Sequence, residues 1–181
     1  MKREIIVTDY ANEITAAIPR GVLVTTKNGD KVNCMTIGWG TLGTMWSMPM
    51  MMIYIREGRF TRQMLDASGD FTLNVPFGDA NVKKITAYCG AKSGRNTDKV
   101  KDLGLTLVES DLVQAPGIAE LPLTLECKVL YRQLLDKNAV PEEIRKAMYP
   151  EHVDSSNPMA NCDYHYCYYG EILKSYIIEQ E

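Results

Sequence analysis

Two short segments of this chain gather the residue types that hold a phosphate group. The first runs from Ile55 to Thr61 (IREGRFT), and the second runs from Ser93 to Lys99 (SGRNTDK). Each segment places cations, a hydroxyl and a glycine in a turn before an expected helix. A guanidinium offers a two-pronged charge-assisted hydrogen bond, and the backbone N–H groups of a helix start add positive potential. We therefore predict that the two turns converge on one anion.

The overall composition limits what that anion can be. The chain has 181 residues, 45% of them hydrophobic, and a formal net charge of -3. An acidic protein is poorly suited to a polyanion, so we expect no nucleic acid partner and favour a single phosphorylated cofactor. No apolar run reaches the ~18 residues of a membrane span, and the N-terminus lacks a secretion signal. We expect a single domain over residues 1–181, located in the cytoplasm with no membrane partner.

The cysteine pattern predicts reduced thiols rather than disulfide bonds or a metal site. The five cysteines, Cys34, Cys89, Cys127, Cys162 and Cys167, form no CxxC motif and no even framework. A chain of this length needs no disulfide to fold, so reduced thiols are expected. Cys162 and Cys167 flank His165, but their spacing matches no standard zinc pattern. We therefore expect no metal.

The elements that must position the two basic turns are mostly strands. Asn-Gly between apolar runs predicts a hairpin with strands Gly21–Thr26 and Lys31–Trp39 around the turn Lys27–Asp30. Further strands are expected at Met50–Ile55, Phe71–Val75, Leu123–Tyr131 and Tyr164–Ile178, the last interrupted at Gly170 by a bulge or a close backbone approach.

The expected helices are short. They cover Thr61–Ala67 before the stop Ser68–Asp70, a segment from the cap Asp79 through Ala87 that Gly90 ends, a segment from near Thr97 to Gly104, and Pro141–Met148. Strands joined mostly by hairpins, with short helices between them, favour a β-rich α+β fold: a closed antiparallel barrel with flanking helices. Residues 133–162 are rich in charge and loop residues and read as a helical and loop insertion.

The order of these motifs resembles the flavin reductase-like family, the FMN-binding split barrels that include flavoredoxin. The residues that carry the likeness are Asn33–Gly40, Arg56–Thr61, Phe71–Val75, Ser93–Lys99 and His165–Glu171, spread between about Ile18 and Tyr176. The resemblance implies a six-stranded, Greek-key split barrel that works as a homodimer, with FMN near the subunit interface.

The resemblance also implies a set of site residues. Asn33 to Gly40 would line the isoalloxazine and the ribityl chain, and Arg59, Thr61, Ser93, Arg95 and Lys99 would surround the phosphate. His165 would lie beside the flavin and is the predicted catalytic residue. The full set of predicted cofactor contacts is Asn33, Met35, Thr36, Ile37, Gly38, Trp39, Gly40, Arg56, Arg59, Phe60, Thr61, Asn74, Ser93, Gly94, Arg95 and Lys99.

Each of these residues also has a plainer interpretation. The arginines could be solvated, Asn33 and Thr36 could bond across strands, and Trp39 and Trp46 could be core or dimer contacts. His165 could be a satisfied structural histidine. Glu57 would repel a phosphate, so its side chain should point away from the site.

The predicted function is an FMN-dependent oxidoreductase of the flavin reductase type. It would take hydride from NADH or NADPH and pass electrons to a flavin or another small acceptor. No GxGxxG follows a strand, so any nicotinamide must dock on the exposed flavin face. One alternative is a non-enzymatic FMN electron carrier that serves a redox protein partner. Another is a binding module for a different phosphorylated ligand.

Overall fold

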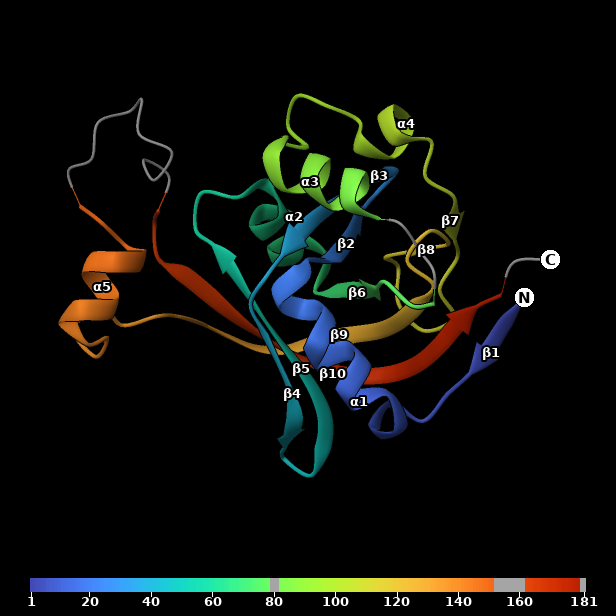
Figure 1. The fold of residues 1–181 in the computed structure, drawn as a ribbon, viewed down its shortest axis with the longest axis horizontal. Coiled ribbons are helices and arrows are strands. Elements are labelled where there is room, and N and C mark those ends of the chain that lie inside the picture. Colours follow the sequence, from blue (N-terminus) through green and yellow to red (C-terminus); the bar gives the residue numbers. More distant parts are fainter. Residues whose placement is uncertain (79–81, 152–161, 180–181) are drawn as a thin grey trace.

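The computed structural model describes residues 1–78, 82–151 and 162–179. Its main sheet contains β1 (Lys2–Glu4), β2 (Val22–Asn28), β3 (Lys31–Ile37), β4 (Gly40–Met45), β5 (Met48–Arg56), β6 (Asp70–Val75), β9 (Leu123–Leu134) and β10 (His165–Ile178). A small second sheet pairs β7 (Leu107–Val108) with β8 (Gly117–Ile118). The helices are α1 (Ala11–Ala17), α2 (Phe60–Ser68), α3 (Lys83–Ala91), α4 (Lys99–Leu103) and α5 (Glu142–Met148) (Figure 1).

The main sheet is antiparallel and split. Its strand order is β3-β2-β6-β9-β10-β5-β4, and β1 pairs with the far end of β10. The six strands from β3 to β5 make the barrel, while β4 and β1 extend it. Within the described residues no ladder joins β3 to β4 or β5. The closed barrel expected from the strand pattern is therefore wrong in that detail, and the split barrel implied by the family resemblance is confirmed.

The hairpin predicted at Asn-Gly is present with a shifted turn. Asn28 still pairs with Lys31, so the loop consists of Gly29 and Asp30, and Gly29 takes the positive φ of 58°. Helix ends follow local signals equally well. Gly69 and Gly104 end α2 and α4 in the left-handed conformation that glycine adopts without strain.

The end of α3 differs from the expectation. Gly90 lies inside the helix, which continues to Ala91. A β-carbon at Gly90 would lie at an ordinary contact distance of 3.5 Å from Thr36, so α3 packs directly on β3 at this point. The predicted cap Asp79 lies outside the described residues.

Gly170 combines the bulge and the close approach that the sequence predicted. The register between β10 and β9 shifts between Tyr169 and Gly170. A β-carbon at Gly170 would lie 2.7 Å from the ring of Phe71 on β6, so glycine leaves room for that ring against β10. β10 pairs with β5 along one edge and with β9 along the other.

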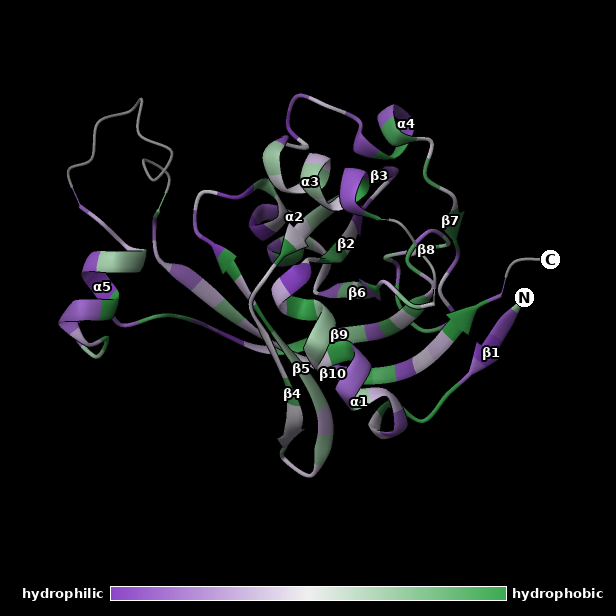
Figure 2. Cartoon of the chain, in the orientation of Figure 1, coloured by the Kyte–Doolittle hydropathy of each residue, from purple (hydrophilic) through white to green (hydrophobic). Residues whose placement is uncertain are grey.

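The barrel core follows from alternation along the strands. Leu123, Leu125 and Cys127 of β9 are fully buried and pack with Phe71 and Leu73 of β6. Figure 2 shows the same alternation of hydrophobic and hydrophilic residues along β9 and β10. None of the helices in residues 1–78, 82–151 and 162–179 is long and apolar enough to cross a membrane.

The hairpin of β4 and β5 was not predicted. Its two-residue turn is Trp46-Ser47, whose φ angles of 52° and 61° are those of a type I′ turn. Asn and Gly usually occupy such positions, so the sequence carries no local signal for this turn. Trp46 is 53% exposed at the tip, so its interpretation as a core residue is wrong.

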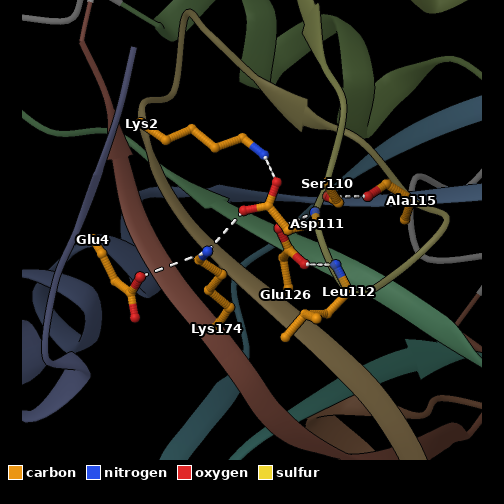
Figure 3. Close-up of polar contacts among 8 residues, drawn as sticks. All are labelled: Lys2, Glu4, Ser110, Asp111, Leu112, Ala115, Glu126 and Lys174. Carbon is orange, nitrogen blue, oxygen red and sulfur yellow. Dashed lines mark hydrogen bonds and ion pairs between the residues drawn. The ribbon is translucent and has the colours of Figure 1, made fainter.

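A polar network holds β1 and the 110–115 loop against the sheet (Figure 3). The Asp111 carboxylate forms ion pairs with Lys2 at 2.7 Å and with Lys174 at 2.8 Å. Lys174 also forms an ion pair with Glu4 at 3.6 Å. The fully buried Glu126 accepts the backbone N–H groups of Asp111 and Leu112 at 2.9 and 2.7 Å. These two hydrogen bonds give the buried carboxylate its partners and hold the loop in place.

Candidate functional site

The two basic turns meet at β3 and enclose one pocket. Arg59 is the N-cap residue of α2. Ser93 to Arg95 lie between α3 and α4, and Lys99 is the first residue of α4. The pocket encloses about 200 Å³. Nine of the predicted cofactor contacts line it: Asn33, Met35, Arg59, Phe60, Thr61, Ser93, Gly94, Arg95 and Lys99.

The three predicted cations of this pocket differ in how free they are. Arg59 is exposed, and its side chain makes no hydrogen bond or ion pair among the described residues. Arg95 donates from Nη1 to the carbonyl of Gly58 at 3.2 Å, and its guanidinium lies 5.7 Å from the centre of the Phe60 ring. Arg59 is therefore the cation most available to an anion.

Lys99 is buried and is held in place by carbonyl groups. Its Nζ donates to the carbonyl oxygens of Cys34 and Cys89 at 2.8 and 3.0 Å. Burial lowers the pKa of Lys99, and the nearby charge of Arg59 lowers it further. An ammonium has three donors, so one remains for an anion in the pocket. That anion would also compensate the charge of Lys99.

Asn33 brings an unpaired acceptor to the same wall. Its Nδ2 donates to the Thr61 hydroxyl at 2.9 Å, but its buried Oδ1 has no hydrogen-bond partner in the part of the chain that the structure describes. A β-carbon at Gly94 would overlap that oxygen and lie 2.8 Å from Cγ of Asn33. Glycine therefore leaves room for the amide. Buried acceptors in proteins nearly always have a hydrogen-bond donor as a partner. A hydroxyl group of a phosphorylated ligand would be a suitable donor for this oxygen.

Three lining residues were not predicted: Gly58, Lys92 and Asp163. Lys92 directly precedes the Ser93 segment, so extending that motif by one residue would have found it. Asp163 is 105 positions from Gly58 and accepts its backbone N–H through Oδ2, a contact that no local pattern signals. Glu57 is exposed and does not line the pocket, as expected for a carboxylate that must avoid an anion.

The structure does not bring four predicted contacts to this pocket. Thr36 donates its hydroxyl to the carbonyl of Thr86 at 2.6 Å, and Ile37 packs in the barrel core. The Asn74 amide is buried, donating to the Thr25 hydroxyl at 2.9 Å and accepting from the Ile118 N–H at 2.9 Å. Arg56 donates to the carbonyl of Asp163 at 2.7 Å. The side chains of Thr36, Asn74 and Arg56 thus make hydrogen bonds within the fold.

The residues that connect β3 to β4 line a second opening. Gly38, Trp39 and Gly40 border a groove of about 510 Å³ together with Tyr54 and Leu135. Trp39 is 39% exposed, so it is not a core residue. Neighbouring segments of the chain therefore line the two openings: Asn33 and Met35 of β3 line the basic pocket, and Gly38 to Gly40, which lead from β3 into β4, line the more apolar groove.

His165 is buried next to Trp39 of the groove, and the linings of the two openings do not include it. Its ring centre is 4.6 Å from that of Trp39, and its Nδ1 lies 2.9 Å from the Tyr149 hydroxyl. Burial lowers the pKa of His165 to about 4, and the charges of Arg56 and Arg59 act in the same direction. At neutral pH the imidazole is therefore uncharged, and it can donate one hydrogen bond and accept another.

Tyr149, in the segment predicted to be an insertion, contacts this histidine. Residues 142–148 form α5 as predicted, with Pro141 at the position before it. Tyr149 follows and stacks on Tyr164 with ring centres 4.5 Å apart. Arg56 lies 5.5 Å from the Tyr149 ring, so this edge of the insertion is fastened to β5 and β10. In the described ranges, no group of three or more potential metal ligands lies together.

Comparisons with known proteins identify a family model, a curated relative and solved structures that the chain resembles. Residues 15–170 match the family model described as flavin reductase like domain. A curated relative, an uncharacterized protein of Archaeoglobus fulgidus, is 28% identical over 123 residues, 68% of each chain. The solved flavoredoxin from Methanosarcina acetivorans has a TM-score of 0.63 and 26% identity, over 88% of this chain and 69% of that chain.

A third similar protein shares the fold at lower identity. It is the FMN-binding domain of a flavin reductases-like enzyme from Shewanella baltica, with a TM-score of 0.67 and 17% identity. The superposition covers 98% of this chain and 77% of that chain.

Proposed function

Because the chain belongs to the flavin reductase-like domain family, we propose that it binds FMN and acts as an oxidoreductase of the flavin reductase type. It takes hydride from NADH or NADPH and passes electrons to a flavin or another small acceptor. The observation that carries this proposal is the convergence of Arg59, Arg95 and Lys99, from two segments remote in the chain, on one pocket.

The residues present fit FMN. Arg59 and the remaining donor of Lys99 bind the phosphate, helped by the hydroxyls of Thr61 and Ser93. The unpaired Oδ1 of Asn33 accepts a hydrogen bond from a ribityl hydroxyl. Gly38 to Gly40 and Trp39 offer the groove for the ring system. FMN, when bound, supplies the hydride and electron chemistry, while the protein positions it and tunes its surroundings.

His165 works as a neutral group in this proposal. An uncharged imidazole next to Trp39 can donate a hydrogen bond to the cofactor edge or to a docking nicotinamide without adding a positive charge. The Tyr149 hydroxyl fixes the orientation of the ring from the other side.

Electron transfer to a protein partner is the second candidate function. The likeness to a solved flavoredoxin at 26% identity favours it. The absence of a nicotinamide-binding motif from the sequence is compatible with it too. A carrier would keep FMN bound and oxidise NADH or NADPH only slowly.

Two measurements test these proposals. An absorbance spectrum of the purified protein, with and without added FMN, shows whether a flavin is retained. Stopped-flow mixing of the FMN complex with NADH and with NADPH then measures the rate at which the flavin bleaches. Bleaching at catalytic rates supports the reductase, and slow bleaching with fast reduction by a redox protein supports the carrier. A colourless protein that takes up no FMN refutes both.

Homodimerisation and a cytoplasmic location remain part of the proposal. The exposed Trp46 at the tip of the β4–β5 hairpin is an apolar surface that a second copy of the chain could cover. Light scattering at several protein concentrations tests the dimer. A monomer at every concentration rejects it.

A further inference from the structure

Two cysteines remote in sequence lie in contact behind the phosphate pocket. Cys34 is on β3, Cys89 is on α3, and both side chains are fully buried. Their sulfur atoms are 3.4 Å apart. Cys127, which is also buried, hydrogen bonds only to a backbone carbonyl among the described residues.

The pair is joined to the pocket through Lys99. The Lys99 ammonium donates to the backbone carbonyl of Cys34 and to that of Cys89, at 2.8 and 3.0 Å. It therefore bridges the two elements that carry the sulfurs, and it also lines the basic pocket. Any change in the spacing of β3 and α3 at this point must move Lys99 or break one of its bonds.

We propose that Cys34 and Cys89 form a redox-active thiol pair, which a peroxide converts into a disulfide that links β3 to α3. A disulfide has an S–S bond of about 2.05 Å, so the sulfurs must approach by roughly 1.4 Å. Side-chain rotation and a small movement of α3 can provide that distance. The thiol pair stands on its own geometry, whereas its effect on FMN rests on the proposed function.

The chemistry balances with hydrogen peroxide as the oxidant. The Cys89 thiol gives up its proton, its thiolate attacks one peroxide oxygen, and the O–O bond breaks, giving a sulfenic acid. The leaving hydroxide takes up the proton from Cys89 and becomes water. The Cys34 sulfur then attacks the Cys89 sulfur, the S–O bond breaks, and water leaves with the Cys34 proton. Two thiols and one peroxide become one disulfide and two waters.

The surroundings favour Cys89 as the attacking sulfur. The hydrogen bond with Cys34 lowers the pKa of the Cys89 thiol, and the charge of Lys99 lowers it as well. The same hydrogen bond and burial raise the pKa of Cys34. Thiolate character controls attack on peroxide, so Cys89 reacts first and Cys34 resolves the sulfenic acid. Burial raises the pKa of Cys127 as well, so Cys127 is a suitable inert control.

The disulfide should weaken the phosphate site. Drawing α3 toward β3 shifts the two backbone carbonyls that accept hydrogen bonds from Lys99. The Lys99 ammonium then moves out of its place in the pocket, which Arg59 also lines. We expect the Kd for FMN to rise at least five-fold in the oxidised protein. Oxidation of this pair would therefore release cofactor when peroxide accumulates.

The first experiment treats the full-length protein with stoichiometric hydrogen peroxide and then alkylates it in denaturant. We expect two fewer alkylated cysteines than the five of the reduced chain, and a linked peptide that contains Cys34 and Cys89. The Cys127→Ser variant should behave like wild type, and Cys34→Ser should stop at an oxidised Cys89 without a linkage. An unchanged thiol count in the wild-type protein, or a linkage between other cysteines, overturns the proposal.

The second experiment measures FMN binding to the oxidised and the reduced protein by fluorescence titration, with dithiothreitol reversal as the control. Equal Kd values within two-fold would overturn the effect on the site. A protein that forms the linkage but binds FMN in neither state contradicts the proposed function and leaves the thiol pair standing.

Discussion

Replacement of Arg59 by alanine should weaken FMN binding and leave riboflavin binding unchanged. The Arg59 side chain makes no hydrogen bond or ion pair among the described residues, so truncating it breaks no polar contact of the fold. The variant should therefore keep its stability within about 0.5 kcal/mol of wild type. What it loses is a charged donor in a pocket that Lys99 and Arg95 also line.

The size of the loss follows from the exposure of the guanidinium. A hydrogen bond to a charged group contributes about 1.5–3 kcal/mol, and solvent screening places an exposed arginine at the lower end. A loss of about 1.5–2 kcal/mol raises the Kd roughly 10- to 30-fold. Arg95→Ala should cost less, because Arg95 already donates to the carbonyl of Gly58.

The assay is a fluorescence titration of the apo protein with FMN and, separately, with riboflavin, which lacks the phosphate. Lys84→Ala serves as the matched control, because Lys84 is exposed on α3 and does not line the pocket. If Arg59→Ala weakens both ligands equally, or if it weakens neither, Arg59 does not bind the phosphate and the placement of FMN is wrong.

Three further predictions concern the fold around the site. The folded-state pKa of His165 is about 4 against 6.5 for an ordinary histidine, so the unfolded chain binds the proton first as pH falls. Stability should therefore drop by about 1–3 kcal/mol between pH 6.5 and pH 4. Urea unfolding should show a shallower drop in His165→Gln, and identical slopes would contradict the shifted pKa. Gly94→Ala should displace Asn33 and abolish detectable FMN binding, while Gly43→Ala, where a β-carbon meets nothing within 4 Å, should bind normally; normal binding by both would show that the tight contact is not needed. Gly170→Ala should lose about 1–3 kcal/mol of unfolding free energy by overpacking against Phe71, and an unchanged thermal midpoint would refute that close approach.

Local patterns were sufficient for most of the barrel. The alternation of Leu123, Leu125 and Cys127 predicts a strand with one buried face, and β9 has that face in the core. Gly69 and Gly104 end their helices because only residues within a turn decide a cap. The turn of β4 and β5 escaped prediction because Trp46 and Ser47 take positive φ without glycine or asparagine, under the constraint of the paired strands.

The sequence by itself determined which residues could hold a phosphate, since charge, hydroxyl and glycine content are local properties of residues 55–61 and 93–99. Only the tertiary structure decided which of them share a pocket. Strand register places the side chains of Thr36 and Asn74 where they form hydrogen bonds within the fold. The same packing brings Asn33 of β3 beside Thr61. The contact of Cys34 with Cys89, and the lysine that bridges them, likewise depend on how α3 packs on β3. Packing between distant segments depends on the whole chain, so no short pattern encodes it.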